Sequence, residues 1–254
     1  MKIEEVEPDK QINVTKFQMS CDVVDQSIPR PLPQKLGFFL LMCAKPGMGK
    51  TNLILSLVCK NGKAFNKKFD KIFLWSPSIN TVSNDPFETL PDDQKFDDID
   101  IENLEEVLDE IRDSGERVLF IWDDIVNQIR SNGQLEKKCH KVLMNRRHLC
   151  GAGGCCSVIM TTQVYNKTSA PLRKVASHLF LWKTSNKKEL ETIYDEMVMI
   201  PRDEWFSILR HTFQRKHDFL YMDLTKNEKS MFHRNFNLLK FQSAGSEIER
   251  KAKD

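Results

Sequence analysis

Residues 36–53, LGFFLLMCAKPGMGKTNL, decide the fold of this chain. The run 36–43 is short, uncharged and rich in aromatic side chains, which predicts a buried parallel strand. Beyond the turn that follows, the apolar residues 53, 54, 57 and 58 repeat on one face of a helix. A strand, a glycine-containing turn that ends in Gly-Lys-Thr, and a helix together are typical of the phosphate-binding P-loop of nucleoside triphosphatases.

Each part of this motif has a chemical task. Gly47 and Gly49 let successive backbone N–H groups point toward an anion, and the helix N-terminus adds its dipole. Lys50 can reach the β and γ phosphates, and the Thr51 hydroxyl can bind Mg²⁺. We therefore expect an ATP-binding loop composed of Ala44, Lys45, Pro46, Gly47, Met48, Gly49, Lys50, Thr51 and Asn52.

One residue of the loop departs from the usual pattern, and a proline changes the cradle itself. Ala44 occupies the position where the first glycine is expected, which is tolerable if its φ stays negative. Pro46 removes one amide from the phosphate cradle. The alternative is an ordinary glycine- and proline-containing turn that happens to precede Gly-Lys-Thr, but the strand before it and the helix after it favour the P-loop.

The composition is that of an ordinary globular protein, with 40% hydrophobic and 29% charged residues in 254. The longest apolar run, 36–44, is too short to cross a bilayer, and the acidic N-terminus has no signal-peptide core. We therefore expect a protein that is neither secreted nor membrane-bound. Seven cysteines, an odd number with several in apolar runs, are typical of reduced core thiols.

Charge is distributed unevenly along the chain. The residues before 130 carry a formal charge of −8 and the rest carry +10, although the whole chain is only +2. Such asymmetry is compatible with an anionic partner on the C-terminal half. A dipolar surface that binds nothing would have the same charges, so the count alone does not decide between them.

Strand and helix patterns alternate along the chain, which predicts an α/β fold with a mostly parallel sheet and helices on both faces. Strands are expected at 36–43, 72–75, 118–122, 157–162, 178–182 and 219–222, the last strand of the chain. Helices are expected after the P-loop, near 101–111, 135–147 and 190–197, and from Pro201. Residues 84–98 are expected to form an acidic loop.

The predicted organisation has three parts. Residues 1–35 form an N-terminal arm, with a leader strand at 12–15 and a proline-rich extended end. Residues 36–242 form the P-loop ATPase domain, and residues 243–254 form a charged, frayed tail.

A second chemical motif, VLFIWDD, covers residues 118–124. A buried strand that ends in an acid places the carboxylate at the edge of the sheet where the phosphate loop lies. Asp123 is therefore the candidate Mg²⁺ partner, and Asp124 is the candidate base that polarises the attacking water. By itself, such a strand can also end in a solvated pair of aspartates.

Gln163 follows the strand 157–162 and is a candidate contact for the γ-phosphate or the attacking water, because an amide can donate and accept at once. Without the other motifs it would be an ordinary polar residue after a strand. Arg146 and Arg147 lie at the end of a predicted helix. They could simply be favoured there by the helix dipole, or one of them could act on the nucleotide of a neighbouring subunit. Arg173 is a rival for that role, and the sequence does not rank the three.

Cysteine and histidine residues between 139 and 156 could suggest a zinc site. The spacing of its candidate ligands does not form two CxxC-type pairs, and several of them fall on core positions, so we do not expect one. The candidates are Cys139, His140, His148, Cys150, Cys155 and Cys156.

Taken together, these motifs resemble the genome-packaging ATPases of nucleocytoplasmic large DNA viruses and their virophages, a branch of the FtsK/HerA-type motors. The resemblance covers residues 36–236 and is most specific between Thr161 and Glu196. It is carried by KPGMGKTNLI, FDKIFLWSPS, VLFIWDD, NRRHL, IMTTQVYNKTSAPLRKVASHLFLWK and NKKELETIYDEM.

The resemblance implies a RecA-like P-loop NTPase that assembles into a ring, often a hexamer, and drives double-stranded DNA into a preformed capsid. Lys50 and Thr51 match the family's phosphate-loop residues, Asp123 its magnesium acid and Gln163 its sensor. Arg147 matches a basic residue proposed to act across the subunit interface. Asp124 stands where the superfamily usually has glutamate, so its reach is one methylene shorter.

The resemblance implies ATP and Mg²⁺ as cofactors, and double-stranded DNA, further copies of the chain and capsid or portal components as partners. It places the protein in the host cytoplasm, the viral factory or the virion. Two other functions remain open from the sequence: a P-loop kinase or other P-loop NTPase, although no basic lid segment is evident, and a nucleotide-bound assembly protein that does not hydrolyse ATP.

Overall fold

The computed structural model describes residues 22–58, 64–78, 87 and 90–241. Within these ranges the chain forms a nine-stranded sheet in the order β3-β2-β4-β5-β1-β6-β7-β8-β9. The strands are β1 Phe39–Cys43, β2 Lys71–Trp75, β3 Lys95–Phe96, β4 Arg117–Trp122, β5 Cys155–Thr162, β6 His178–Trp182, β7 Phe219–Asp223, β8 Phe232–Arg234 and β9 Asn237–Leu238.

Helices connect most of these strands. They are α1 Lys50–Val58, α2 Ile101–Ile111, α3 Val126–Ser131, α4 Gly133–Asn145, α5 Ala170–Arg173, α6 Lys187–Met197, α7 Arg202–Thr212 and α8 Glu228–Met231, with short 3-10 turns η2 at Asp92–Gln94 and η3 at Tyr165–Lys167. Side-chain caps explain where several of them begin: Asp100 and Asn103 form a capping box on α2, and Asn132 and Asn186 cap α4 and α6.

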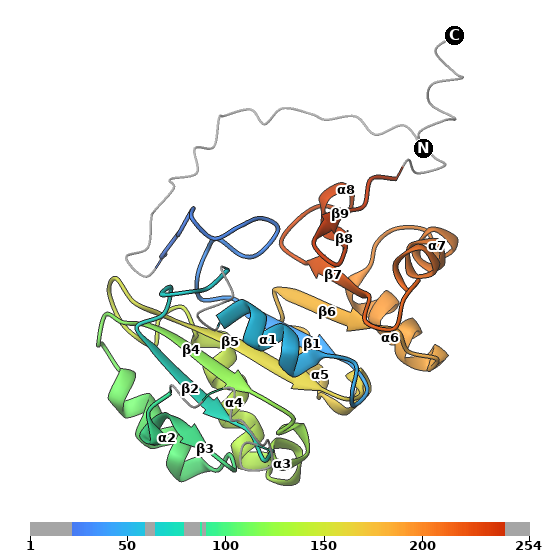
Figure 1. The fold of residues 1–254 in the computed structure, drawn as a ribbon. Helices are drawn as coiled ribbons and strands as arrows, with labels where there is room; N and C mark the ends of the chain where they lie inside the picture. The colour runs from blue at the N-terminus through green and yellow to red at the C-terminus, as the bar shows by residue number, and fades with distance from the viewer. Residues whose placement is uncertain (1–21, 59–63, 79–86, 88–89, 242–254) are drawn as a thin grey trace, which may run out of the picture.

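The sheet is parallel in its larger part. β1 pairs in parallel with β5 on one side and with β6 on the other, and β5, β4, β2 and β3 continue the parallel order. β7, β8 and β9 add an antiparallel edge. The predicted α/β class with a mostly parallel sheet is confirmed, and Figure 1 shows helices on both faces of the sheet.

The two faces of the sheet bury separate apolar clusters. The alternation of β1 shows this: Phe39 and Leu41 point into one cluster, while Phe38, Leu40 and Met42 point into the other. The first cluster packs against α2, α3, α4, α6 and α7. The second packs against α1 and the loops around residues 28–36 and 64–69. The central strands are therefore buried on both sides, which explains their nearly continuous apolar sequences.

Four local expectations were wrong. Within residues 84–98, η2 and β3 interrupt the expected loop, because β3 pairs with the end of β2. Phe219–Asp223 is not the last strand, since β8 and β9 extend the sheet by short antiparallel pairings. α3 follows β4 where no helix was expected, and Pro201 caps α7 instead of occupying its first helical position.

The described part of the N-terminal segment, residues 22–35, is not an extended arm. Val24 and Lys35 pair across an antiparallel bridge, so the segment closes into a loop. Its Ile28 and Leu32 are buried in the cluster beneath α1. Apolar burial therefore holds this loop against the sheet, and the boundary at residue 35 stays a prediction.

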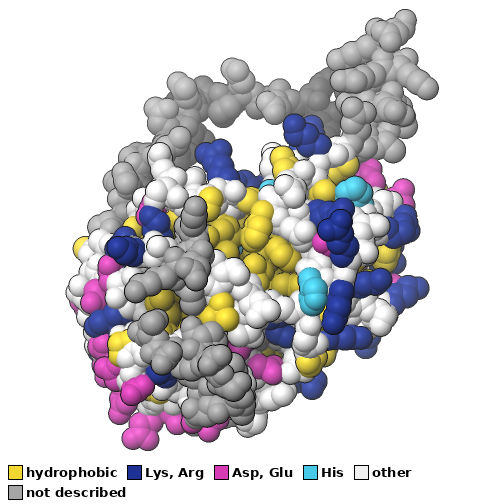
Figure 2. All heavy atoms as spheres, viewed as in Figure 1, with side chains coloured by type: hydrophobic (Ala, Val, Ile, Leu, Met, Phe, Trp, Pro, Cys, Tyr) yellow, Lys and Arg dark blue, Asp and Glu magenta, His cyan; other side chains and the backbone are white. Residues whose placement is uncertain are grey.

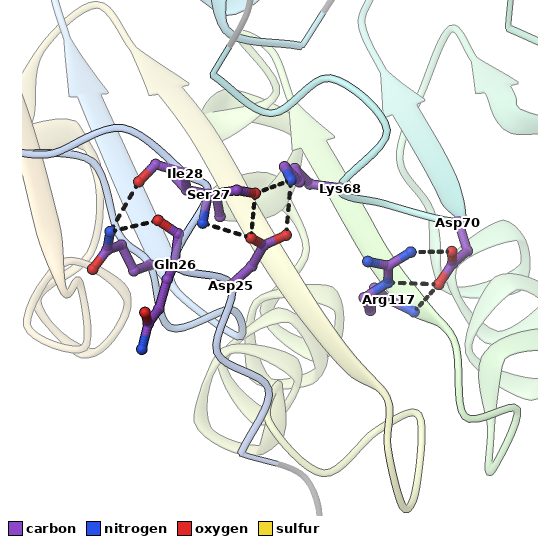
Figure 3. Close-up of polar contacts among 8 residues, drawn as sticks. Asp25, Gln26, Ser27, Ile28, Lys68, Asp70 and Arg117 are labelled. Carbon is purple, nitrogen blue, oxygen red and sulfur yellow. Dashed lines mark hydrogen bonds and ion pairs between the residues drawn. The ribbon is translucent and has the colours of Figure 1, made fainter.

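Polar contacts fasten the same loop to the domain (Figure 3). Asp25 accepts hydrogen bonds from the backbone N–H and hydroxyl of Ser27 and forms an ion pair with Lys68 at 2.9 Å. Nearby, Asp70 and Arg117 form a two-pronged ion pair, 2.6 and 3.0 Å, which joins the starts of β2 and β4. These contacts lie at the edge of the sheet where the parallel strands begin.

The charge asymmetry of the sequence is visible on the surface. In Figure 2, acidic side chains gather at the lower left, over α2 and β3, and basic side chains gather on the right, over α6 and α7. In the part of the chain that the structure describes, no helix has the length and apolarity needed to span a bilayer. The leader strand predicted at 12–15 and the tail predicted from 243 lie outside the described residues.

Candidate active site

The loop between β1 and α1 has the backbone of a phosphate cradle. Ala44 N donates to Thr162 O at 3.0 Å, which continues the β1–β5 ladder by one residue before the chain turns. Gly47 and Gly49 then adopt φ angles of +71° and +100°, which glycine takes without steric cost. Ala44 does not adopt a positive φ, so alanine fits in place of the first glycine, as the sequence required.

The side chains of the loop divide between surface and interior. Lys45, Pro46, Thr51 and Asn52 are exposed, and Met48 is half-buried against the cluster beneath α1. An open surface of glycine backbone and exposed side chains leaves the amides of the loop accessible to an anion.

Lys50 is the first residue of α1 and turns back over the loop. Its Nζ donates to the Ala44 carbonyl at 2.6 Å, from a half-buried position. Burial lowers the pKa of Lys50, and the charges of Asp124 and Asp123 oppose that change. The lysine and both aspartates are therefore close enough to interact electrostatically, as expected for a shared nucleotide site.

Asp123 follows β4 and is held by two hydroxyl groups. Thr161 Oγ1 donates to Asp123 Oδ1 at 2.8 Å, and Ser76 Oγ donates to Oδ2 at 3.4 Å. Only 8% of Asp123 is exposed, and burial raises the pKa of its carboxyl group. The hydroxyl groups fix one orientation of the carboxylate, which suits a metal partner.

Asp124 and Gln163 meet at the ends of adjacent strands. The Gln163 amide Nε2 donates to Asp124 Oδ2 at 2.6 Å, and Asp124 N donates to Thr161 Oγ1 at 2.9 Å. Asp124 has a φ of +58°, a left-handed conformation that is uncommon outside glycine but that aspartate adopts more readily than most residues. The turn after β4 thereby directs Asp123 toward the hydroxyl groups and Asp124 toward Gln163.

The oxygen-rich side chains at this edge fit Mg²⁺. Mg²⁺ prefers oxygen ligands and takes one or two protein oxygens together with water and substrate phosphates. The buried, hydroxyl-held carboxylate of Asp123 and the exposed hydroxyl of Thr51 supply such ligands. These oxygen atoms are therefore suitable ligands for Mg²⁺, and the assignment of Thr51 and Asp123 as metal ligands stays a prediction.

Three contributors to the site were missed by sequence reasoning. Thr161 bridges both aspartates, and Ser76 supports Asp123 from the end of β2. His217, from the loop before β7, places Nδ1 3.2 Å from the Met48 carbonyl of the P-loop. The hydroxyl residues follow apolar strands, which was a usable signal, but nothing local to His217 indicates a contact 169 residues away.

The three candidate arginines differ in their contacts. Arg146 donates to the Gly37 carbonyl at 2.8 Å and to the Leu143 carbonyl, so it supports the end of α4. Arg173 forms a two-pronged pair with Glu196 at 2.6 and 2.7 Å and is also engaged inside the fold. These contacts give both arginines structural tasks.

Arg147 pairs with Asp22, and about a third of its side chain is exposed. It packs against Gly37, where an added Cβ would meet the Arg147 side chain at 2.8 Å. Gly37 precedes β1 and the P-loop follows β1, so Arg147 lies at the opposite edge of the sheet from the P-loop of its own chain. Arg147 therefore does not act on that site from within the same chain.

The cysteines behave as core residues. Five of them, Cys43, Cys139, Cys150, Cys155 and Cys156, are buried and free. Burial raises the pKa of Cys139 and Cys150 to about 12, so these thiols stay protonated in the apolar core. Among the described residues, no group of three or more His, Cys, Asp and Glu side chains is placed to hold a metal ion.

The fold and the candidate site together have the arrangement that is typical of P-loop NTPase folds: a parallel sheet with β1 at its centre, the glycine loop at the end of that strand, and the paired aspartates at the end of β4. No known family model matches the sequence, and no curated protein matches it either. Solved structures therefore provide the comparison.

The chain is similar in structure to B204, the DNA-packaging ATPase from Sulfolobus turreted icosahedral virus, with a TM-score of 0.56 and 14% sequence identity over 80% of this chain and 99% of B204. A B204 structure from Sulfolobus turreted icosahedral virus 2, in complex with sulfate, gives a TM-score of 0.50 at 15% identity, over 80% of this chain and 98% of that one. The pCW3 conjugation coupling protein TcpA, solved with ATPγS, gives 0.52 at 11% identity, over 86% of this chain and 66% of TcpA. These likenesses establish a shared fold across most of the chain.

Proposed function

We propose that this protein is an ATP-hydrolysing motor that moves double-stranded viral DNA into a preformed capsid. The observation that carries the proposal is the meeting of Lys50, Asp123 and the Asp124–Gln163 pair at one edge of the sheet. The fold shared with the packaging ATPase B204 and the coupling protein TcpA supports the same reading. The resemblance of the sequence motifs to viral packaging ATPases is the basis for proposing DNA as the substrate and a capsid as its destination.

In this proposal the P-loop amides and Lys50 bind the triphosphate of ATP, and Thr51 with Asp123 holds the metal. Mg²⁺, when bound, neutralises charge on the phosphate oxygens. Asp124 orients and accepts a proton from the attacking water, and Gln163 holds the Asp124 carboxylate through its amide N–H while its carbonyl stays available as an acceptor. The rate of γ-phosphate hydrolysis then depends on how accurately Lys50, Asp124 and Gln163 are positioned around the phosphate and the water.

Arg147 completes the site of a neighbouring copy in a ring, which we expect to be a hexamer. Support comes from its position at the opposite sheet edge and from its partly exposed guanidinium. A head-to-tail contact that joins opposite edges of two copies forms a ring when the rotation between successive copies closes, and an open filament when it does not. The basic C-terminal half supplies contacts to DNA phosphates, and capsid or portal components are the further partners. The expected locations are the host cytoplasm, the viral factory and the virion.

The first test measures ATP hydrolysis with and without double-stranded DNA for wild type, Lys50→Ala and Asp124→Asn. The motor predicts wild-type hydrolysis that rises with DNA and falls by about 100-fold or more in both variants. Phosphate transfer to nucleoside monophosphates in place of water would instead identify a P-loop kinase. ATP binding by wild type that is lost in Lys50→Ala, with no hydrolysis in either, would identify an assembly protein.

The second test examines Arg147 in trans. Arg147→Ala and Asp124→Asn are each inactive in the proposal, but mixing them creates interfaces with one intact arginine and one intact aspartate, so activity returns. Asp22→Asn is the matched control, because it removes the partner of Arg147 without removing the guanidinium. An Asp22→Asn variant as inactive as Arg147→Ala, with no recovery on mixing, would reduce Arg147 to a structural ion pair.

A further inference from the structure

Glu189 is a buried acid next to the candidate active site, and the proposed mechanism does not use it. It lies in the first turn of α6 and is 3% exposed. Buried glutamates are rare unless they are hydrogen-bonded, and each oxygen of Glu189 has a partner. Oε1 accepts from Tyr165 N at 2.5 Å, and Oε2 accepts from the Thr184 hydroxyl at 2.9 Å.

The partners of Glu189 belong to the two segments that form the site. Cys43, the last residue of β1 before the P-loop, directs its thiol toward Glu189 Oε1 at 3.6 Å. Burial and the neighbouring carboxylate raise the pKa of Cys43 well above its ordinary value, so the thiol keeps its proton and donates it. Tyr165 comes two residues after Gln163. One carboxylate thus joins the end of β1 to the loop that carries Gln163.

The same helix holds the other end of Tyr165. Glu196, two turns further along α6, accepts from the Tyr165 hydroxyl at 3.0 Å and forms the two-pronged pair with Arg173. Residues seven apart lie on the same face of a helix, so Glu189 and Glu196 both face the segment after β5. Tyr165 itself is fully buried between them. Its backbone and its hydroxyl are therefore both fixed by α6.

We propose that Glu189 is a positioning residue that holds the Gln163 loop in register with the P-loop, and that α6 controls Gln163 through it. The inference rests on the proposed function for its kinetic consequence, while the structural coupling stands on the contacts alone. Gln163 contacts Asp124, so the path runs from α6 through Tyr165 and Gln163 to the proposed base.

The arrangement needs a carboxylate in particular. Both Glu189 oxygens accept hydrogen bonds, and a glutamine offers one accepting oxygen and one NH₂ group. In Glu189→Gln, the NH₂ group either faces Tyr165 N, and that bond is lost, or faces the Thr184 hydroxyl, which must then turn from donor to acceptor. In both cases the charge-assisted bond from Tyr165 N to a carboxylate is removed or weakened. The side chain keeps its size, so the variant tests the hydrogen bonds with little change in packing.

The first experiment measures hydrogen–deuterium exchange of the full chain. We expect Glu189→Gln to speed exchange in peptides that cover 163–168 by about 10-fold or more, without a change in β7 at 219–223. Glu191→Gln is the matched control, because it makes the same chemical change on the same helix at a half-exposed position. Exchange in 163–168 that is the same in Glu189→Gln and Glu191→Gln overturns the proposal.

The second experiment measures steady-state ATP hydrolysis with double-stranded DNA. We expect Glu189→Gln to lower kcat by about 10- to 100-fold and to leave KM within about 2-fold, because Gln163 is displaced while the P-loop still binds ATP. In a Gln163→Ala background, the same change should lower kcat by less than about 2-fold, since both act through one group. Equal effects in the two backgrounds overturn the proposal.

A third variant guards against misfolding. Glu189→Asp keeps the charge but shortens the side chain, so it should fold and give an intermediate exchange rate in 163–168; a rate equal to wild type counts against the proposal. If wild type hydrolyses no ATP with DNA present, the proposed motor fails, and the exchange measurement still decides whether Glu189 holds the loop.

Discussion

The side-chain amide of Gln163 donates a hydrogen bond of 2.6 Å to the carboxylate of Asp124, although 39 residues separate them in the chain. The contact joins the ends of the adjacent parallel strands β4 and β5. It depends on the left-handed backbone of Asp124, which directs the carboxylate toward β5. The two residues therefore act as one unit, and their variants should not behave independently.

Kinetics should reveal that coupling. We expect Gln163→Ala to lower kcat for ATP hydrolysis by about 10- to 100-fold and Asp124→Asn by about 100- to 1,000-fold, because each removes part of the group that orients water. The double variant should be no slower than Asp124→Asn. The comparison is a double-mutant cycle of kcat, with Gln134→Ala, an exposed glutamine in α4, as the control. A double variant whose losses multiply would mean that the residues act separately.

Much of the fold follows from local patterns. The uncharged run before the P-loop, the glycine spacing and the apolar helix face together predicted β1, the cradle and α1. The sequence also predicted the bounds of β6, His178–Trp182, because His178 and the four apolar residues after it are flanked by polar ones. Such segments carry their structure in composition and period, which are properties of neighbouring residues.

The parts that were missed depend on distant partners. β9 has two residues and exists only because it pairs with β8, so no period could indicate it. The positive φ of Asp124 occurs together with hydrogen bonds to Thr161 and Gln163, both across the sheet. Glu189 appeared in the sequence as one charge of an amphipathic helix, and only the fold brings it to Tyr165 and Cys43.

Removal of the Asp123 charge should stabilise the protein while it destroys activity. Burial raises the pKa of this carboxyl group, so the folded state holds its proton more tightly than the unfolded state does. At pH 7 the charged Asp123 carboxylate therefore lowers the free energy of unfolding. This loss is recovered as the pH falls through the pKa of Asp123 in the folded state. We expect Asp123→Asn to raise Tm by about 2–4 °C at pH 7, for a gain of about 1 kcal/mol.

Thermal unfolding at pH 7 and at pH 4 tests this expectation. The gain should shrink at the lower pH, where Asp123 takes up a proton and resembles asparagine. Asp92→Asn is the control, because the Asp92 side chain is fully exposed. If Asp123→Asn had a lower Tm than wild type at both pH values, the hydrogen bonds to the Asp123 carboxylate would outweigh the cost of burying its charge.

Asp25 should show the opposite pH dependence. Its hydrogen bonds to Ser27 and its ion pair with Lys68 lower its pKa from 3.8 to about 2. The lowered pKa means that the charged Asp25 stabilises the folded state at pH values above 3.8. This stabilisation is lost as the pH falls through about 2. We therefore expect Asp25→Asn to lower the free energy of unfolding at pH 6, and the difference from wild type to disappear near pH 2.

Urea unfolding at several pH values between 2 and 6 measures that difference, with the exposed Asp93→Asn as the control. The N-terminal loop is the region that Asp25 fastens, so exchange of its amides around 22–35 should increase in the same variant. A loss of stability that is constant down to pH 2 would assign the effect to packing instead of charge.

Gly154, in the turn that leads into β5, has no room for a side chain. A Cβ there would lie 2.6 Å from the Glu116 carbonyl oxygen and 2.6 Å from the Gly115 carbonyl carbon, both backbone atoms that cannot turn away. β5 carries Thr161 and leads to Gln163, so a shift at its start also moves the site. We expect Gly154→Ala to cost about 1–3 kcal/mol and to lower ATPase activity in the folded fraction.

Gly133→Ala is the matched control, because Gly133 is the first residue of α4 and a Cβ there meets nothing within 4 Å. Alanine restricts the unfolded chain and favours the helix, so this variant should gain up to about 1 kcal/mol. Urea unfolding should show a lower free energy of unfolding for Gly154→Ala and a higher one for Gly133→Ala, if the space around the added Cβ decides the outcome. Two variants of equal stability would show that the turn before β5 relaxes around the added methyl group, and that the position of Gln163 does not depend on that turn.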